Sequence, residues 1–250
     1  MKVYFDDAFY QIYTSDPAAA AGRMEAVVAA LEDEVAFETI RPAAEIDILR
    51  VHSRRHLERV RDEGVFEIAA LAAGGAIQAA TRALSEPAFA LVRPPGHHAS
   101  ADSCWGFCYF NNMAVALARL KQTGSIARAF VLDFDLHYGD GNVNILGELP
   151  WITIVNPEAS SANRYLEETA AALAGDSFDI IGVSAGFDNH VEDWGGLLAT
   201  DDYDTLGGMV RRAAENQQAG CFGILEGGYN HAVLGLNVRA FIHGMCGEPE

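Results

Sequence analysis

The chain alternates between short, continuously apolar runs and longer segments in which apolar residues recur with helical spacing. The short runs have the length and the branched and aromatic side chains of buried strands. They are Ala88–Val92, Ala129–Phe134, Trp151–Val155, Ile180–Ser184 and Cys221–Leu225. Because these runs are apolar on both sides, they predict a parallel sheet that is buried on both faces.

The segments between these runs are rich in alanine and have the spacing of helices. They are Ala18–Glu34, Glu67–Ala83, Met113–Lys121, Tyr165–Ala174 and Tyr203–Gln218. Asp16 and Pro17 suit the start of the first helix, Asp204 and Thr205 the start of the last, and Gly220 its end. Alternating strands and helices predict an α/β fold with helices on both faces of the sheet. Since no repeat or linker interrupts the pattern, we expect one domain over residues 1–250.

The composition is that of a globular protein, with 50% hydrophobic and 21% charged residues. Its unusual feature is acidity, because 17 Lys and Arg stand against 35 Asp and Glu, for a net charge of −18. Such a surface repels a phosphate backbone, so nucleic acid is not an expected partner. It favours a cation such as a polyamine or a lysine-rich peptide, although acidity that serves only solubility explains the same number.

No stretch approaches the roughly 20 apolar residues of a membrane helix, so we expect no membrane partner. The carboxylates of Asp6 and Asp7 stand where a secretory signal would be apolar. Four cysteines are too few for a disulfide scaffold. Cys104 and Cys108 have CxxxC rather than redox CxxC spacing, and we expect them to be structural. These features together predict a cytoplasmic enzyme whose oligomeric state the sequence leaves open.

Polar and glycine-rich motifs directly follow four of the predicted strands. They are Arg93–His98, Asp133–His137, Ser184–Asp188 and Glu226–Tyr229. The carboxyl ends of parallel strands share one edge of a sheet, where ligands of open α/β folds bind. We therefore expect the histidines, the aspartates and the tyrosine of these motifs to line one cleft.

The second and third of these motifs, Asp133–His137 and Ser184–Asp188, predict a metal site. If the strand stays extended past Asp133, then Asp133, Asp135 and His137 point to one side. A lone DxDxH pattern is a weak signal, but Asp188 follows a separate strand and supplies another ligand. Three ligands, Asp135, His137 and Asp188, with an open position are typical of catalytic zinc. Since two carboxylates neutralise much of the ion's charge, the site needs a separate base.

His97 and His98 are the candidates for that base, although tandem histidines alone are often plain surface residues. Asp133 and Asp140 are free to hold one imidazole each, which fixes its tautomer and raises its basicity. Tyr229 could donate a hydrogen bond to an oxyanion, while core packing is the alternative for an isolated tyrosine.

The motifs and their order resemble those of histone deacetylases, a family that includes bacterial deacetylase-like amidohydrolases and acetylpolyamine deacetylases. The matching segments are Arg93–Ala99, Gly106–Asn112, Asp133–His137, Gly139–Gly141, Ser184–Asp188 and Gly227–Asn230. The resemblance runs from about Tyr10 to the C-terminus. It implies a zinc-dependent amidohydrolase built on an arginase-like parallel sheet.

The resemblance also implies metal ligands. Asp135, His137 and Asp188 match the family's zinc ligands, for one zinc ion per chain. The family binds a potassium ion through main-chain oxygens, which would lie here around Asp133, Asp135 and His137. Zinc and ferrous iron cannot be told apart from the sequence.

By the same resemblance, His98 matches a general base that later acts as an acid and pairs with Asp140. His97 matches its electrostatic partner and pairs with Asp133. Tyr229 matches the residue that polarises the substrate carbonyl.

Gly106 and Phe107 match one wall of the family's substrate tunnel, and Gly227 and Gly228 lead into the tyrosine on the other side. The segments 64–72 and 151–165 are shorter than in many relatives, so we expect a more open cleft. Asp193–Gly196 stands where the family has Asp-Pro-Leu-Gly, which places Trp194 near the rim. We hypothesise that Trp194 replaces the second aromatic wall that the short 151–165 segment lacks. Simple packing of a loop is the alternative.

The leading interpretation is a zinc-dependent deacetylase of an N-acylated amine such as acetyllysine, an acetylpolyamine or a small amide. A two-metal ureohydrolase of the arginase type shares the expected fold. A degenerate deacetylase fold that only senses a ligand or docks a partner is the third possibility.

Overall fold

The computed structural model describes residues 1–175 and 177–247. Its centre is a seven-stranded sheet in the order β2-β1-β3-β7-β6-β4-β5, in which every pair of neighbours is parallel. The strands are β1 (Lys2–Tyr4), β2 (Ala36–Glu38), β3 (Ala88–Ala90), β4 (Ala129–Asp133), β5 (Ile152–Val155), β6 (Ile180–Ala185) and β7 (Gly220–Leu225).

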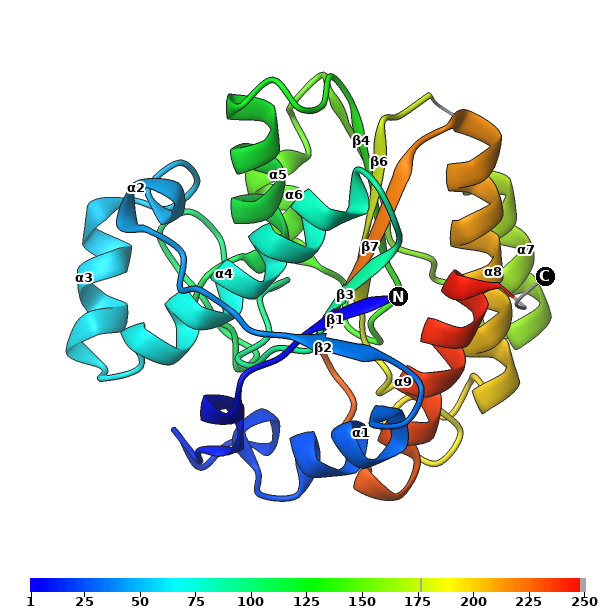
Figure 1. Ribbon diagram of the computed structural model, residues 1–250, viewed down its shortest axis with the longest axis horizontal. Coiled ribbons are helices and arrows are strands. Elements are labelled where there is room, and N and C mark those ends of the chain that lie inside the picture. Colours follow the sequence, from blue (N-terminus) through cyan, green and yellow to red (C-terminus); the bar gives the residue numbers. More distant parts are fainter. Residues whose placement is uncertain (176, 248–250) are drawn as a thin grey trace.

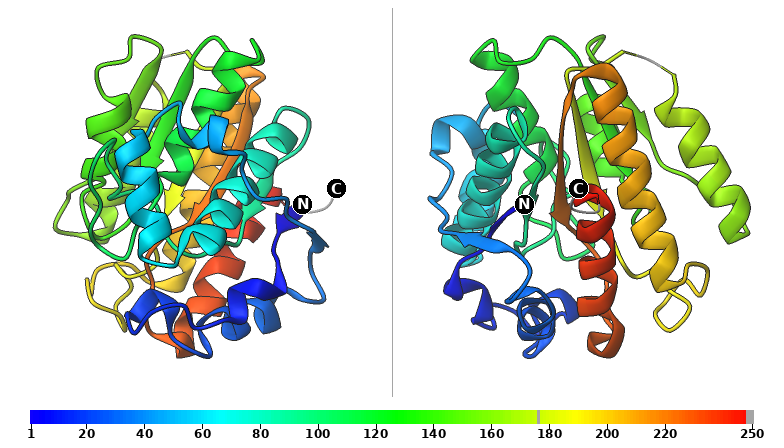
Figure 2. Two further views of the ribbon diagram at one scale, coloured as in Figure 1. Left: turned by 90° about the vertical axis from the view of Figure 1, so that its left-hand side faces the viewer. Right: turned by 45° about the vertical axis from the view of Figure 1, so that its right-hand side comes forward.

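Helices cover both faces of the sheet, as the sequence predicts. Helices α4 and α5 lie on one face and α7, α8 and α9 on the other (Figure 1; Figure 2, right-hand view). The α-helices are α1 (Arg23–Leu31), α2 (Glu45–Ile48), α3 (Arg54–Asp62), α4 (Phe66–Ala83), α5 (Asn112–Gln122), α6 (Asp140–Leu146), α7 (Ala162–Leu173), α8 (Thr200–Gln217) and α9 (His231–Cys246). Two short 3-10 helices, η1 (Asp7–Tyr10) and η2 (Pro17–Ala19), precede α1.

The predicted helix Ala18–Glu34 is wrong as a single element. Asp16 and Pro17 do start a helix, since the Asp16 carboxylate accepts a hydrogen bond from the Ala19 amide at 2.9 Å, but this helix is η2. The chain then turns at Gly22, whose φ of +85° is accessible mainly to glycine, and only afterwards begins α1. Alanine-rich composition predicted the helical conformation but not this break.

The predicted start of the helix before β7 and the role given to Gly220 are also wrong, although the predicted end at Gln218 lies within one residue of the observed end. Helix α8 begins at Thr200, where the Asp202 carboxylate accepts a hydrogen bond from the Ala199 amide at 2.8 Å. Asp204 therefore lies inside the helix. At the other end Gln218 adopts the left-handed conformation, with φ of +54°, and Gly220 is already the first residue of β7.

The strand order brings the motifs together. The four polar motifs follow β3, β4, β6 and β7, and these four strands are neighbours in the sheet. Because all strands are parallel, the four motif loops leave the same edge. None of the helices formed by the described residues has the length and apolar character that crossing a bilayer requires.

Candidate active site

Three side chains with metal-binding atoms meet at the carboxyl edge of the sheet. The donor atoms of Asp135, His137 and Asp188 all lie within 4.8 Å of one another. The route to this arrangement differs from the one predicted, because β4 ends at Asp133 and the following residues bend. The side chains thus converge through a turn and not through an extended strand.

Both carboxylates of this group are held by backbone amides. Asp135 accepts hydrogen bonds from the His137 amide at 2.9 Å and from the Gly227 amide at 2.8 Å. Asp188 accepts one from the Leu136 amide through Oδ1 at 3.1 Å, while its buried Oδ2 has no hydrogen-bond partner among the described residues. A Cβ atom at Gly227 would lie 2.6 Å from an oxygen of each carboxylate, so the site requires glycine there.

The electrostatics of the group favour a cation. His137 faces the carboxylates of Asp135 and then Asp188, which stabilise its protonated form and raise the pKa of His137 to about 10, so the site already attracts a proton. Burial and the neighbouring charge of Asp135 raise the pKa of Asp188 to about 6. Two adjacent buried carboxylates, one with an oxygen that accepts no hydrogen bond and lies 3.1 Å from His137 Nδ1, form a donor set that fits a divalent ion.

Two histidine–aspartate pairs lie beside the metal-binding group. His97 Nδ1 is 3.3 Å from Asp133 Oδ2, and His98 Nδ1 is 2.7 Å from Asp140 Oδ1. The imidazole rings of His97 and His98 are in contact, with centroids 3.9 Å apart. Both pairings that the sequence analysis expected are therefore present.

The environments push the two imidazoles in opposite directions. Burial opposes the charge of His97, but the charges of Asp135 and Asp133 outweigh it and raise the pKa of His97 well above its ordinary value. Burial, followed by the charge of His97, lowers the pKa of His98 to about 4. Asp140 acts to raise the pKa of His98, as expected, but burial is the larger effect.

Tyr229 lies on the turn after β7, between two other aromatic rings. The Trp194 indole stacks on it with centroids 4.0 Å apart, and Phe107 meets it edge-on at 5.9 Å. Burial and the charges of Asp135 and Asp188 raise the pKa of the Tyr229 phenol, which keeps its proton available for donation.

Two of the predicted substrate-wall glycines, Gly106 and Gly228, allow close packing and a tight turn in the site. Gly106 packs so closely on His98 that an added Cβ would lie 2.3 Å from its Cδ2 atom. Gly228 has φ of +116°, which allows the tight turn into Tyr229. A hollow of about 400 Å³ borders Asp135 where the short 151–165 segment passes the site.

Several residues that shape the site were not singled out from the sequence. Asp193 Oδ2 accepts hydrogen bonds from the Tyr229 and Asn230 amides at 2.8 and 2.7 Å and so fixes the tyrosine turn. Arg23 is fully buried and donates to the main-chain oxygens of Gly228 and Glu226. These contacts join distant segments, and only the position of Asp193 beside Trp194 hinted at them.

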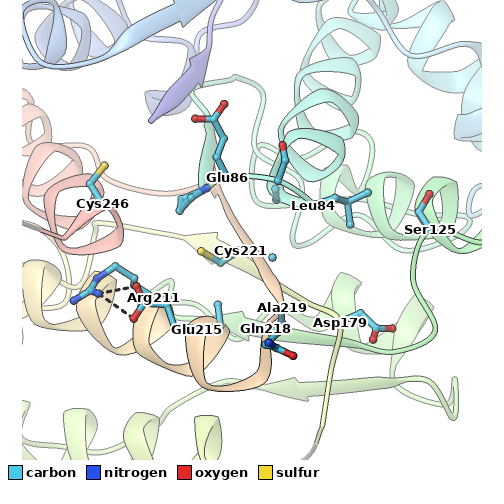
Figure 3. A pocket seen from close by; sticks show the side chains of 15 residues that line it. Leu84, Glu86, Ser125, Asp179, Arg211, Glu215, Gln218, Ala219, Cys221 and Cys246 are labelled. Carbon is cyan, nitrogen blue, oxygen red and sulfur yellow. Dashed lines mark hydrogen bonds and ion pairs between the residues drawn. The ribbon is translucent and has the colours of Figure 1, made fainter. Parts of the chain in front are cut away.

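A second hollow, of about 740 Å³, lies away from this site at the opposite edge of the sheet, where β7 begins (Figure 3). Its charged lining includes Arg211, which is already bound to Glu215 at 2.8 and 3.0 Å. None of the predicted site residues lines it.

A comparison with protein families matches residues 18–165 to the histone deacetylase domain. The chain belongs to the histone deacetylase family. The match covers more than half of the chain and includes Asp135, His137, both histidine–aspartate pairs and the Gly106–Phe107 wall.

Relatives extend the match over most of the chain. A "Probable deacetylase" of Methanothermobacter thermautotrophicus is 32% identical over 91% of this chain and 85% of its own length. A "Histone deacetylase-like amidohydrolase" of Pseudomonas aeruginosa is 29% identical over 92% of this chain and 79% of its own length. A "Polyamine deacetylase HDAC10" of Danio rerio is 26% identical over 84% of this chain and 41% of its own length.

A solved structure shares the fold. The HDA15 HD domain superposes with a TM-score of 0.85 over 99% of this chain and 91% of its own, at 23% identity. The single parallel sheet with helices on both faces is therefore the fold of the histone deacetylase family. As a member of that family, the chain is a deacetylase-type hydrolase that acts on amides.

Proposed function

We propose that this protein is a zinc-dependent amidohydrolase that removes an acetyl or other acyl group from an N-acylated amine. The observation that carries the proposal is the convergence of Asp135, His137 and Asp188, with one buried carboxylate oxygen unpartnered, beside the His97–His98 pair. Tyr229, on the neighbouring strand end, supplies a hydroxyl donor at the same edge.

Asp135, His137 and Asp188 would hold the zinc ion, one per chain. When bound, the ion polarises the amide carbonyl and makes water a better nucleophile at neutral pH. The potassium ion that the resemblance implies near Asp133, Asp135 and His137 stays a prediction.

The chain's own residues then move the protons. His98 is the general base, because the hydrogen bond from its Nδ1 to Asp140 leaves the Nε2 lone pair free to accept a proton from the attacking water. The same nitrogen later returns a proton to the leaving amine. His97, held by Asp133, supplies positive charge beside this transfer.

Tyr229 donates its hydroxyl hydrogen bond to the substrate carbonyl oxygen, where negative charge develops in the transition state. Trp194 on one side and Phe107 on another border the tyrosine ring. We therefore assign Trp194, Gly106, Phe107 and the Gly227–Gly228 turn to the walls that hold the acyl chain. Trp194 takes the place of the wall that the short rim loops do not provide.

The substrate that these features favour is a cationic amine carrying a neutral acyl group. The net charge of −18 attracts such a molecule, and three relatives carry the name polyamine deacetylase.

A substrate panel on the zinc-loaded protein tests the proposal. It compares acetyllysine peptides, acetylputrescine, acetylspermidine and longer acyl chains, with Asp188→Asn as the control that should lose both zinc and activity. We expect acetate release with about one zinc bound per chain. Bound zinc without turnover of any acylated amine would instead indicate a binding module. Hydrolysis of a guanidinium substrate with two metals per chain would indicate a ureohydrolase.

A further inference from the structure

Trp105 is an exposed tryptophan that lies against the proposed general base. Its indole and the His98 imidazole have centroids 3.8 Å apart and planes inclined by 30°. Trp105 is 54% exposed, whereas His98 is only 3% exposed. A large apolar side chain that stays at the surface while covering a buried histidine needs a reason beyond core packing.

The same indole also binds the partner of that histidine. Trp105 Nε1 donates a hydrogen bond to Asp140 Oδ2 at 2.9 Å. The other carboxylate oxygen, Oδ1, accepts the hydrogen bond from His98 Nδ1 at 2.7 Å. Trp105 thus touches both members of the pair, one through its ring face and one through its N–H group.

The other pair, His97 and Asp133, shows what the Trp105 contact supplies to His98 and Asp140. The Asp133 side chain is 0% exposed, and Asn142 Nδ2 donates to its Oδ2 at 2.9 Å, so burial and an amide hold it. The Asp140 side chain is 36% exposed and lies at the rim. Trp105 gives the Asp140 carboxylate the second donor that Asn142 gives Asp133, and its ring covers the His98 imidazole.

The backbone around Trp105 is shaped to keep it there. Gly106 has φ of +57° and Phe107 has φ of +66°, and the second value is costly for a residue with a side chain. The turn brings the Gly106 Cα against the His98 ring, where an added Cβ would lie 2.3 Å from Cδ2. Trp105 and Gly106 together wrap the histidine.

We propose that Trp105 is a positioning residue for the proposed reaction, acting by two separable contacts. Its N–H group fixes the Asp140 carboxylate and hence the orientation of His98, and its ring keeps bulk water from the imidazole. The role in turnover rests on the proposed amidohydrolase function, whereas the two contacts do not.

Trp105→Phe and Trp105→Ala separate the two contacts. Trp105→Phe keeps a ring over His98 but loses the N–H donor, and we expect kcat for an acetylated amine to fall roughly ten- to hundred-fold, as when other outer-shell partners are removed. KM and zinc affinity should stay at their wild-type values, because the hydrogen bond and ring contact of Trp105 go to Asp140 and His98 and not to Asp135, His137 or Asp188. Trp151→Phe, at the opposite edge of the sheet, controls for loss of a tryptophan. A wild-type kcat in Trp105→Phe would overturn the positioning role.

Chemical labelling tests whether the Trp105 ring shields His98 from solvent, and it does not require turnover of any substrate. Diethylpyrocarbonate modifies accessible neutral imidazoles, and mass spectrometry locates the product. We expect His98 to be unmodified in the wild type and in Trp105→Phe, and modified in Trp105→Ala. Trp194→Ala removes an equally exposed indole from Tyr229 and should leave His98 unmodified. Equal labelling of His98 in the wild type and Trp105→Ala would overturn the shelter, whereas failure of the wild type to release acetate would count only against the amidohydrolase function.

Discussion

Single residues in this site owe their chemistry to their neighbours. His97 and His98 are adjacent in the chain, yet the pKa of His97 is raised and the pKa of His98 is lowered. The difference arises because Asp135 and Asp133 face His97, whereas burial and the charge of His97 dominate at His98. A separation of this kind assigns different roles to two identical side chains.

The hydroxyl of Tyr229 offers a direct test at this scale. Tyr229→Phe keeps the ring that Trp194 and Phe107 contact and removes only the proposed oxyanion donor. We expect kcat to fall roughly 10²- to 10³-fold, the range for loss of such a donor, with the fold unchanged. Steady-state kinetics beside Tyr138→Phe, an exposed tyrosine next to the site, measure the effect. Unchanged turnover in Tyr229→Phe would remove Tyr229 from the mechanism.

Buried His52 predicts how stability depends on pH. Burial, then the neighbouring His56, lowers the pKa of His52 from 6.5 to about 4. Between these pH values the unfolded chain binds a proton at His52 that the folded chain does not bind. The free energy of unfolding therefore decreases as the pH falls from about 6.5 to about 4. The full loss is roughly 3 kcal/mol.

Denaturant unfolding of the wild type and of His52→Gln between pH 7 and pH 4 measures this loss of unfolding free energy. Glutamine can replace the hydrogen bonds of His52 with the Ser100 carbonyl and the Asn111 amide but does not titrate. The unfolding free energy should therefore depend less steeply on pH in the variant. Parallel curves would show that His52 does not carry the dependence.

Residue patterns predicted which side chains gather at the site better than they predicted the contacts that support them. The metal-binding group and both histidine–aspartate pairs follow from motifs that lie directly after strands. Asp193 and Trp105 did not follow, because their roles depend on contacts across loops whose path no local pattern specifies.

At the scale of elements, α8 and α9 pack through glycines. A Cβ atom at Gly207 would lie 2.2 Å from the Phe241 carbonyl oxygen of α9. At the adjacent Gly208 the nearest atom, at 3.0 Å, is the flexible end of Arg212. Close approach of the two helices therefore depends on one glycine and not on its neighbour.

These neighbours form a matched pair of substitutions. Gly207→Ala should destabilise the protein by roughly 1–3 kcal/mol, because the helix backbones must separate. Gly208→Ala should be neutral or stabilising by up to about 1 kcal/mol, since alanine favours a helix more than glycine does. Thermal or denaturant unfolding measures both, and equal effects would contradict the packing argument.

Elements with strong patterns were predicted and short ones were not. The apolar runs gave β3 to β7 within a few residues, but β1 and β2 have three residues each and no distinguishing period. Helices α3 and α6 are short, and α9 is apolar on several sides, so its pattern does not stand out. Their positions are fixed by tertiary packing.

At the scale of the whole molecule, the strand order creates the site. The motifs that lie side by side in the site follow β3, β7, β6 and β4, which are neighbours in the sheet but far apart in the chain. A parallel sheet could be predicted from the sequence, and with it the shared edge. The order itself could not, because nothing local specifies that β7 lies between β3 and β6.

The net charge of −18 predicts how salt affects substrate capture. For acetylspermidine, kcat/KM should fall as salt rises from about 0.01 to 1 M, because the screening length shrinks from roughly 30 to 3 Å. A neutral acylated amine of similar length should show little change. Identical salt dependence for the two substrates would mean that the acidity serves solubility alone.

The proposed function requires that one metal ion at Asp135, His137 and Asp188 make this chain an active deacetylase. Titration of zinc into chelator-treated protein, with acetate release followed at each addition, tests it most directly. Activity should rise in proportion to zinc and level off at about one ion per chain. Full activity in the metal-free protein, or a saturated site without acetate release, would contradict it.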